Sequence, residues 1–286
     1  MHEAMHKKQI ALVTGTSSGF GLLISIELAK AGYHVIATMR ELNRRGELME
    51  VAQSHGLSTC IECLPLDVTD HQAIRNTVRQ VIDQHGRIDV LVNNAGISLG
   101  GFVEELPFED WVQSMETNFF GIVVMTQEVL PHMRKAKSGK IINISSVSGR
   151  LGFPGYGPYA ASKFALEGFS ESLRFEMLPY GVHVSLVEPG AYQTAIWSKG
   201  FDSIALLTKA DSPYQKPLAA IVAYGKNLVK HASDPHDVAK TVVRIAQSRY
   251  PRLRYAQGKG ALVAIWGKAL LPWKWFEQIL LRQLRK

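Results

Sequence analysis

The chain contains few of the features that define disulfide-built, membrane-spanning or disordered proteins. Only two cysteines occur in 286 residues. Two cysteines cannot cross-link a chain of this size, which excludes a disulfide-stabilised secreted scaffold. The chain also lacks a run of ~20 uncharged apolar residues, so no membrane-spanning helix is expected. Charged residues make up 20% and hydrophobic residues 46% of the chain, which is typical of a globular protein with a substantial core.

Acidic residues are almost absent from the C-terminal part. Residues 240–286 contain eleven basic residues and one acidic residue, Glu277, whereas the formal charge of the whole chain is +7. The rest of the chain is therefore slightly acidic, and we expect no nucleic-acid partner, because such proteins carry basic residues over the binding face. Residues 1–8 are polar and the following apolar run is short, so no secretory signal is expected and we predict a cytoplasmic protein.

Apolar segments rich in Val and Ile alternate with segments of helical periodicity. The expected strands are residues 10–14, 35–39, 57–64, 88–92, 140–144 and 182–187, and the expected helices are residues 20–31, 72–84, 109–133 and 160–178. Uniformly apolar strands separated by helices predict a parallel sheet covered on both faces, the doubly wound α/β arrangement of the Rossmann-type fold.

The alternation lapses once, at residues 191–233, and resumes at Asp234-Pro235, a typical helix start. An interruption of this length in a compact domain favours a functional lid over a plain connection. We therefore predict a single domain with its core at residues 8–190 and 234–258, a substrate lid at residues 191–233 and an amphipathic tail at residues 259–286.

A glycine-rich turn joins the first expected strand to the first expected helix. Its spacing is G-x-x-x-G-x-G, starting at Gly15. Glycines permit a tight turn and a close backbone approach to a pyrophosphate, whose charge faces the N-terminus of the helix. The turn therefore predicts a dinucleotide site formed by Gly15, Thr16, Ser17, Ser18, Gly19, Phe20 and Gly21.

The end of the second expected strand distinguishes between the nicotinamide cofactors. An acidic residue there would bind the ribose hydroxyls of NAD, but the strand ends with Met39 followed by Arg40, with Arg44 and Arg45 nearby. A guanidinium suits a 2′-phosphate, so the sequence favours NADP(H) over NAD(H). Further cofactor contacts are expected after the third and fourth strands, from Asp67, Val68, Asn93, Ala95 and Gly96.

Tyr159 and Lys163 are spaced four residues apart at the start of an expected helix and therefore share one face. A phenol with a pKa of ~10 is a poor catalyst at neutral pH, and an ammonium ~4 Å away would favour the phenolate by about 4 kcal/mol at most. Ser146 ends the preceding strand, where its hydroxyl can hold a substrate oxygen. Asn118 occupies an apolar position of a helix, and its buried amide requires partners.

These motifs together resemble the short-chain dehydrogenase/reductase family from about residue 8 to residue 245. The resemblance implies that Tyr159 is the general acid/base, that Ser146 orients the carbonyl or hydroxyl group and that Lys163 binds the nicotinamide ribose and tunes Tyr159. It also implies that Asn118 holds a proton-relay water. Further cofactor contacts implied by the resemblance are Pro189, Gly190 and Thr194.

Two longer runs, residues 35–40 and 159–176, resemble the branch that contains estradiol 17β-dehydrogenase and retinol dehydrogenases. This similarity implies a bulky apolar alcohol or ketone as substrate, and the family's helix-pairing mode implies a homodimer or homotetramer. The activity implied is hydride transfer between NADP(H) and a carbonyl or alcohol carbon. A catalytically silent NADP(H)-sensing protein of the same fold is the alternative.

Aromatic residues are available around the expected catalytic group. Beside Ser146, the expected substrate contacts are Phe153, Tyr156, Tyr192 and Trp197. This set lacks an arginine that could bind a carboxylate, so a hydrophobic substrate is favoured, although each aromatic residue could equally belong to the core.

The tail combines three tryptophans, Trp266, Trp273 and Trp275, with aliphatic and basic residues. This composition is typical of a segment that lies at a membrane surface, and it also suits a pocket wall or a subunit contact. Packing is favoured over membrane contact, because the side chains of basic amphipathic segments often lie over a core. Cys60 and Cys63 have C-x-x-C spacing, but no further ligands accompany them and the histidines form no cluster in the sequence. We therefore expect no metal site.

Overall fold

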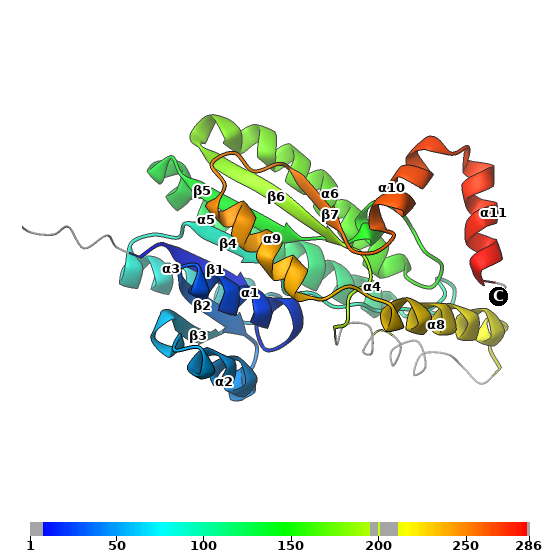
Figure 1. Cartoon of the computed structure of the whole chain (residues 1–286), viewed down its shortest axis with the longest axis horizontal. Coiled ribbons are helices and arrows are strands. Elements are labelled where there is room, and N and C mark those ends of the chain that lie inside the picture. Colours follow the sequence, from blue (N-terminus) through cyan, green and yellow to red (C-terminus); the bar gives the residue numbers. More distant parts are fainter. Residues whose placement is uncertain (1–7, 195–199, 201–210, 285–286) are drawn as a thin grey trace, which may run out of the picture.

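The computed structural model describes residues 8–194, 200 and 211–284. Its centre is a seven-stranded sheet in which every neighbouring pair is parallel, with the strand order β3-β2-β1-β4-β5-β6-β7. The strands are β1 (Ile10–Thr14), β2 (His34–Met39), β3 (Ile61–Pro65), β4 (Val90–Asn93), β5 (Gly139–Ile144), β6 (Val182–Pro189) and β7 (Arg254–Gln257). The prediction of a doubly wound parallel sheet is confirmed (Figure 1).

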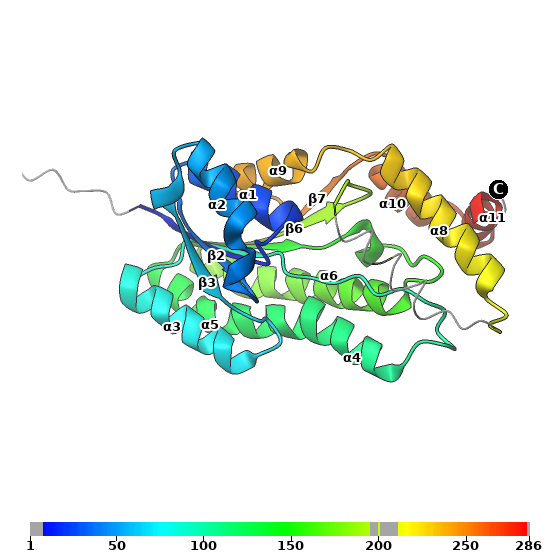
Figure 2. The same ribbon diagram turned by 90° about the horizontal axis from the view of Figure 1, so that it is seen from below.

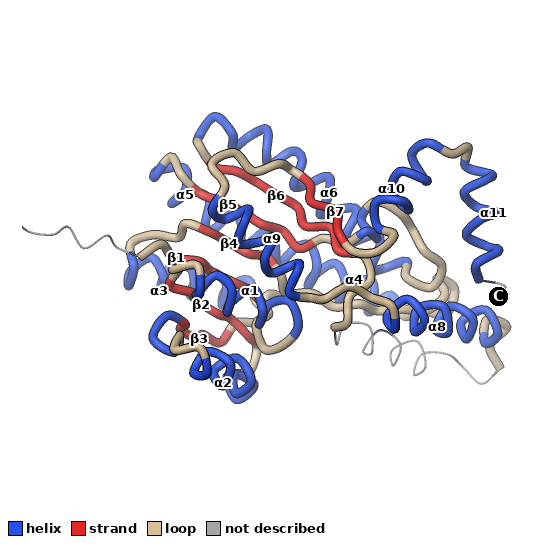
Figure 3. Tube along the Cα trace, viewed as in Figure 1, coloured by secondary structure: helices blue, strands red, loops and turns tan. Residues whose placement is uncertain are grey.

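Helices cover both faces of this sheet (Figures 2 and 3). One face is covered by α1 (Gly19–Lys30), α2 (Gly46–Ser54) and α9 (His236–Gln247), and the other by α3 (His71–His85), α4 (Phe108–Met115), α5 (Gly121–Ala136) and α6 (Gly157–Met177). The central strands are buried over their whole length, which explains why their sequences are uniformly apolar. Two apolar clusters, one on each face, form the core.

Three of the helices after β6 lie at one end of the sheet rather than on its faces (Figure 2). They are α8 (Gln215–Lys230), α10 (Ala261–Leu270) and α11 (Trp273–Leu284). Because β6 ends at Pro189 and β7 ends at Gln257, this group lies beyond the carboxyl ends of the strands. In an open parallel sheet, ligands bind at that end.

Two elements differ from the sequence prediction. The helix expected at residues 109–133 is interrupted by a π-helical segment, Glu116–Phe120, which separates α4 from α5. The irregular stretch expected at residues 191–233 contains the 16-residue helix α8. Pro217 lies in the first turn of α8, where proline is compatible with a helix.

The third strand is also shorter than expected. It begins at Ile61, after a 3₁₀ turn at Ser58–Cys60, rather than at residue 57. Cys60 and Cys63 are both free thiols.

Candidate active site

The glycine-rich turn connects β1 to the N-terminus of α1. Gly15 has φ +71° and Gly19 has φ +61°, a left-handed conformation that side chains rarely adopt. A Cβ on Gly15 would lie 2.8 Å from the Cα of Ala95, and one on Gly21 would collide with the carbonyl oxygen of Gly15. The three glycines therefore allow the turn to pack directly against the end of β4.

Thr14 and Asn94 hold the turn in place. The Asn94 side chain donates hydrogen bonds to the carbonyl oxygens of Thr14 (2.9 Å) and Gly15 (3.0 Å). The Thr14 hydroxyl accepts from the backbone N–H groups of Asn94 and Ala95, each at 3.0 Å. This network fixes the shape of the predicted pyrophosphate site before any ligand binds.

The remaining predicted cofactor residues lie at the carboxyl ends of β2, β3 and β4. Arg40 follows β2 and is exposed. Asp67 accepts hydrogen bonds from the backbone and the hydroxyl of Thr69, which orients its carboxylate, and Val68 is buried beside it. The side chain of Asn93 points into the protein and donates to Asn143 at 2.8 Å, so Asn93 can offer a ligand only its backbone.

Tyr159 and Lys163 lie on the first turns of α6, and Ser146 follows β5. Ser146 accepts a hydrogen bond from the backbone N–H of Ser148 at 3.0 Å, and its hydroxyl lies near enough to Tyr159 to lower the pKa of the phenol. The Lys163 ammonium donates to the carbonyl oxygen of Ile144 at 2.8 Å and lies 5.8 Å from the centre of the Tyr159 ring. The structure thus brings the three residues together.

Burial controls the acid–base properties of this group. It raises the pKa of Tyr159, while the hydrogen bond with Ser146 acts in the opposite direction. It lowers the pKa of Lys163 to about 8, and the carboxylate of Glu167 opposes this shift. The net shift of the phenol pKa is therefore upward, opposite to the direction expected from the nearby ammonium, because desolvation by burial is its largest cause.

Asn118 lies in the π-helical segment and is fully buried. Its side chain accepts from the backbone N–H of Ile97 at 2.8 Å, and it donates to the carbonyl oxygen of Ile97 at 2.9 Å and to Ser162 at 3.0 Å. Its amide partners are therefore found on the loop after β4 and on α6. A π-helical bulge is often found at functional sites, and here it aims Asn118 at the catalytic helix.

The segment after β6 reaches the glycine turn. Gly190 donates its backbone N–H to Gln257 at 2.9 Å. A Cβ placed on Gly19 would lie 3.9 Å from the Cβ of Thr194. The hydroxyl of Thr194 is buried and has no hydrogen-bond partner among the described residues.

The surroundings of Thr194 and Gly96 suit a bound dinucleotide. Thr194 supplies an unpaired buried hydroxyl close to the glycine turn. A Cβ on Gly96 would lie 3.2 Å from the side-chain oxygen of Asn118 and 3.9 Å from the Lys163 ammonium, so Gly96 leaves open space between these polar groups. A nicotinamide dinucleotide binds at the carboxyl end of a parallel sheet, where glycines leave backbone and polar groups accessible to it.

The predicted substrate residues are only partly brought together. Phe153 and Tyr156 pack in a separate apolar cluster with Leu218 and Ile221 of α8, next to Tyr159 in the chain. Tyr192 does not join them: its ring is buried in the core and packs edge-on against Phe20 at 5.5 Å. Tyr192 pairs with Ser233 in an isolated bridge, which places it under α1 and α9. Trp197 lies outside the described residues.

Comparison with known proteins identifies the family. The family model for short chain dehydrogenases matches residues 9–204. The chain belongs to the short-chain dehydrogenase family. Members of this family are nicotinamide-dependent oxidoreductases that act on alcohol or carbonyl groups, and this chain is one of them.

Three relatives of this short-chain dehydrogenase match most of its length. An uncharacterized oxidoreductase of Bacillus subtilis is 43% identical over 97% of this chain and 99% of its own. A 3-ketodihydrosphingosine reductase of Bacteroides thetaiotaomicron is 37% identical over 87% of this chain and 88% of its own. Human 17-beta-hydroxysteroid dehydrogenase type 1 is 36% identical over 87% of this chain and 77% of its own.

Solved structures agree with this assignment. A short-chain dehydrogenase from Streptomyces avermitilis is 34% identical and superposes with a TM-score of 0.78, covering 94% of this chain and 93% of its own. A metagenomic short-chain oxidoreductase in complex with NADP is 28% identical, with a TM-score of 0.69 and coverage of 87% and 96%.

One feature of this short-chain dehydrogenase has no counterpart among the sequence predictions. Glu167 and Glu188 are buried beneath the catalytic helix and share Arg254, whose Nε lies 3.0 Å from Glu167 and 3.3 Å from Glu188. Glu167 also accepts from Ser145 at 2.6 Å. Burial raises the pKa of Glu188 to about 7, with Glu167 adding to the shift and Arg150 opposing it. The three residues are distant in sequence and show no motif, but Glu167 lies one turn after Lys163.

The C-terminal tail leaves its aromatic residues exposed. Trp266, Trp273 and Trp275 are each about 60% exposed, at 59%, 64% and 61%. α11 contacts α8, and Lys268 of α10 donates to the backbone of Arg150 at 2.6 Å, so the tail is attached to the domain. Among the described residues, no helix is both long and apolar enough to cross a membrane.

Proposed function

We propose that the chain is an NADP(H)-dependent oxidoreductase that transfers hydride between the nicotinamide and the carbonyl or alcohol carbon of a hydrophobic substrate. The observation that carries the proposal is the grouping of Tyr159, Ser146 and Lys163 beside the apolar cluster of Phe153 and Tyr156. The cofactor supplies or accepts the hydride when bound, so the protein must orient the substrate and move one proton.

Each catalytic side chain has a role that its surroundings support. Tyr159 is held as a neutral phenol by burial, which suits a proton donor for carbonyl reduction. Ser146, close to the same phenol, orients the substrate oxygen. Lys163 binds the nicotinamide ribose and stabilises the phenolate left after proton transfer. Asn118 holds the loop after β4 against α6 and places a proton-relay water.

Preference for NADP(H) rests on Arg40. It is exposed at the carboxyl end of β2, where the ribose of the adenosine half binds in this fold, and no acidic residue ends the strand. A planar guanidinium can bind a 2′-phosphate with two hydrogen bonds. The NADP complex of a relative with 28% identity agrees with this preference.

A hydrophobic substrate is favoured by the surroundings of Tyr159. Phe153, Tyr156, Phe102 and Tyr214 belong to one apolar cluster next to the catalytic residues. One relative is named a 3-ketodihydrosphingosine reductase and another a 17-beta-hydroxysteroid dehydrogenase. Sphingoid bases and steroids are both bulky apolar molecules. We propose a substrate of this kind, a steroid, retinoid or lipid with one ketone or secondary alcohol.

We further propose that the tail contacts an anionic membrane surface, where such substrates dissolve. The exposed tryptophans of α10 and α11 provide aromatic rings that settle at the lipid interface, and Lys274 and Arg282 provide positive charge beside them. An enzyme with these features would work at the cytoplasmic face of a membrane. By analogy with the family, we propose a homodimer or homotetramer as its assembly.

The alternative is a cofactor-sensing protein that binds NADP(H) without turnover. The complete set of Asn118, Ser146, Tyr159 and Lys163 favours the enzyme. A panel of steroid, retinoid and sphingoid ketones, with the absorbance of the reduced nicotinamide as readout, distinguishes the two. Oxidation of NADPH that depends on one class of ketone supports the proposal, whereas tight NADPH binding with no oxidation on any ketone supports the sensor.

A further inference from the structure

Three residues with metal-binding side chains meet at the end of the sheet opposite the catalytic group. His34 is the first residue of β2, Glu62 the second of β3 and His85 the last of α3. Ile36 pairs with Glu62, so His34 and Glu62 are diagonal neighbours on the same face. The helix α3 packs on this face through Ile74, Val78 and Val81, which brings His85 to the same point.

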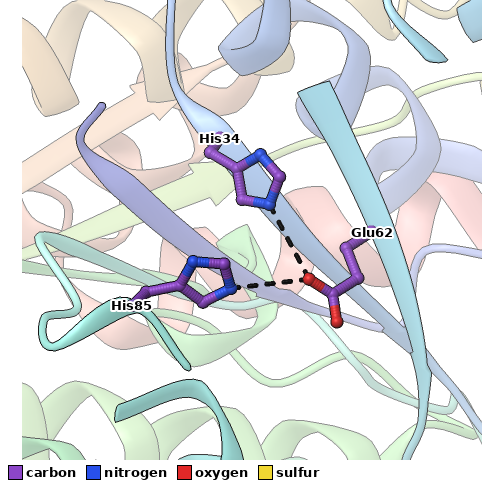
Figure 4. A group of neighbouring side chains, drawn as sticks. All are labelled: His34, Glu62 and His85. Carbon is purple, nitrogen blue, oxygen red and sulfur yellow. Dashed lines mark ion pairs between the residues drawn. The ribbon is translucent and has the colours of Figure 1, made fainter. Parts of the chain in front are cut away.

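Both imidazoles direct Nε2 toward one carboxylate oxygen (Figure 4). Nε2 of His34 lies 3.7 Å and Nε2 of His85 lies 3.4 Å from Oε2 of Glu62. The three ligand atoms lie within 4.8 Å of one another. These separations exceed a normal hydrogen bond. They are close to the ~3.3–3.5 Å between neighbouring ligand atoms of a tetrahedral zinc ion whose bonds are ~2.0–2.2 Å.

The two Nε2 atoms are buried and have no hydrogen-bond partner among the described residues. Their contacts with Glu62 are longer than a normal hydrogen bond and satisfy these buried nitrogens poorly, whereas a metal ion would satisfy both at once. The site is still accessible, because the side chains of His34, His85 and Glu62 are 21%, 22% and 32% exposed.

An imidazole binds a metal through the lone pair of a ring nitrogen, so zinc and protons compete for the Nε2 atoms of this cluster.

We propose that His34, Glu62 and His85 bind one Zn²⁺ ion, with water completing the coordination. Two imidazoles and one carboxylate form a known zinc donor set, and imidazole favours zinc over magnesium or calcium. The ion joins β2, β3 and α3 and stabilises this edge of the sheet. The stretch of β2 from His34 to Arg40 spans ~20 Å at ~3.3 Å per residue. The ion therefore lies far from the proposed cofactor site and takes no part in hydride transfer.

The sequence contains no signal for this site. The ligands are 28 and 23 residues apart and none belongs to a metal-binding motif, which is why no metal site was expected. Only the parallel register of β2 and β3 and the length of α3 bring them together.

The test uses the untagged full-length chain, treated with chelator and titrated with zinc against a chromophoric chelator. His2 and His6 are replaced by alanine in every protein, because these N-terminal histidines can bind zinc on their own. The variants are H85A and E62Q, the latter nearly isosteric. The matched control is H71A, because His71 faces a single carboxylate, Glu116, at 3.6 Å and has no second imidazole among the described residues.

We expect the parent to bind one zinc ion per chain, and zinc to raise the midpoint of its thermal unfolding. Zinc affinity should be at least tenfold weaker in H85A and E62Q and unchanged in H71A. NADPH affinity should be the same in all four proteins, which also shows that each is folded. Equal zinc affinity in the parent and E62Q, or no binding by the parent at excess zinc, would overturn the proposal. Both outcomes are independent of the proposed oxidoreductase activity.

Discussion

At the scale of single residues, Lys163 decides how the site responds to pH. The sequence identifies Tyr159, Ser146 and Lys163 as a group, because the four-residue spacing on a helix and the preceding strand are visible in it. Their protonation is not visible, because it depends on how completely α6 and β5 exclude water. Burial holds the Tyr159 phenol neutral and lowers the pKa of Lys163 to about 8.

Carbonyl reduction should therefore slow as the pH rises through about 8, the pKa of Lys163. Proton donation by Tyr159 leaves a phenolate that the Lys163 ammonium stabilises, and this charge is lost above that pKa. The pH dependence of kcat for ketone reduction, with NADPH affinity measured at each pH, checks this. A rate that stays constant up to about pH 10, near the ordinary pKa of lysine, would contradict it.

We propose that Arg40 sets a preference for NADP(H). Arg40→Asp removes a charge-assisted hydrogen bond worth about 1.5–3 kcal/mol, so NADPH affinity should fall by roughly tenfold to a hundredfold while NADH affinity changes little. Fluorescence titration with both cofactors measures the ratio. Arg79→Asp, an exposed residue of α3, makes the same change in net charge and serves as the control. An unchanged ratio in Arg40→Asp would refute the assignment.

At the scale of elements, the sequence predicts the strands and the catalytic helix better than the segments after β6. The strands are buried on both faces and keep an apolar pattern. The π-helical segment and α8 were missed for physical reasons: a π-bulge leaves the hydrophobic pattern almost unchanged, and Pro217 is compatible with a first helical turn. Tyr192 was predicted to contact the substrate but lies in the core, because aromatic residues are common in both environments.

The exposed faces of α10 and α11 lead to a further prediction. The full-length chain should sediment with anionic vesicles at low salt, and a double variant, Trp273→Ser and Trp275→Ser, should bind several-fold more weakly because two interfacial rings are lost. Phe175→Ser, an equally exposed aromatic position on α6, should bind like the parent. Equal sedimentation of the double variant and the parent, or no sedimentation of the parent, would exclude this contact.

At the scale of the whole molecule, two ends of one sheet serve different purposes. The glycine turn, Arg40 and the proposed catalytic residues follow the carboxyl ends of the strands. The cluster of His34, Glu62 and His85 lies at the amino ends of β2 and β3 (Figure 4). The excess of basic residues lies in the last 47 residues. Local patterns in the sequence therefore predict the fold and the grouping of Ser146, Tyr159 and Lys163. The buried Glu167–Arg254–Glu188 network and the cluster at His34 required the strand order.

The central claim is that Tyr159 transfers the proton during hydride transfer between NADP(H) and an apolar carbonyl. The most direct measurement compares NADPH oxidation by the parent, Tyr159→Phe and the exposed control Tyr250→Phe on the best ketone of the panel, with NADPH affinity measured separately. We predict that Tyr159→Phe loses about 10²- to 10⁴-fold in kcat and keeps its NADPH affinity, while the control matches the parent. Turnover by Tyr159→Phe at the rate of the parent would contradict the account.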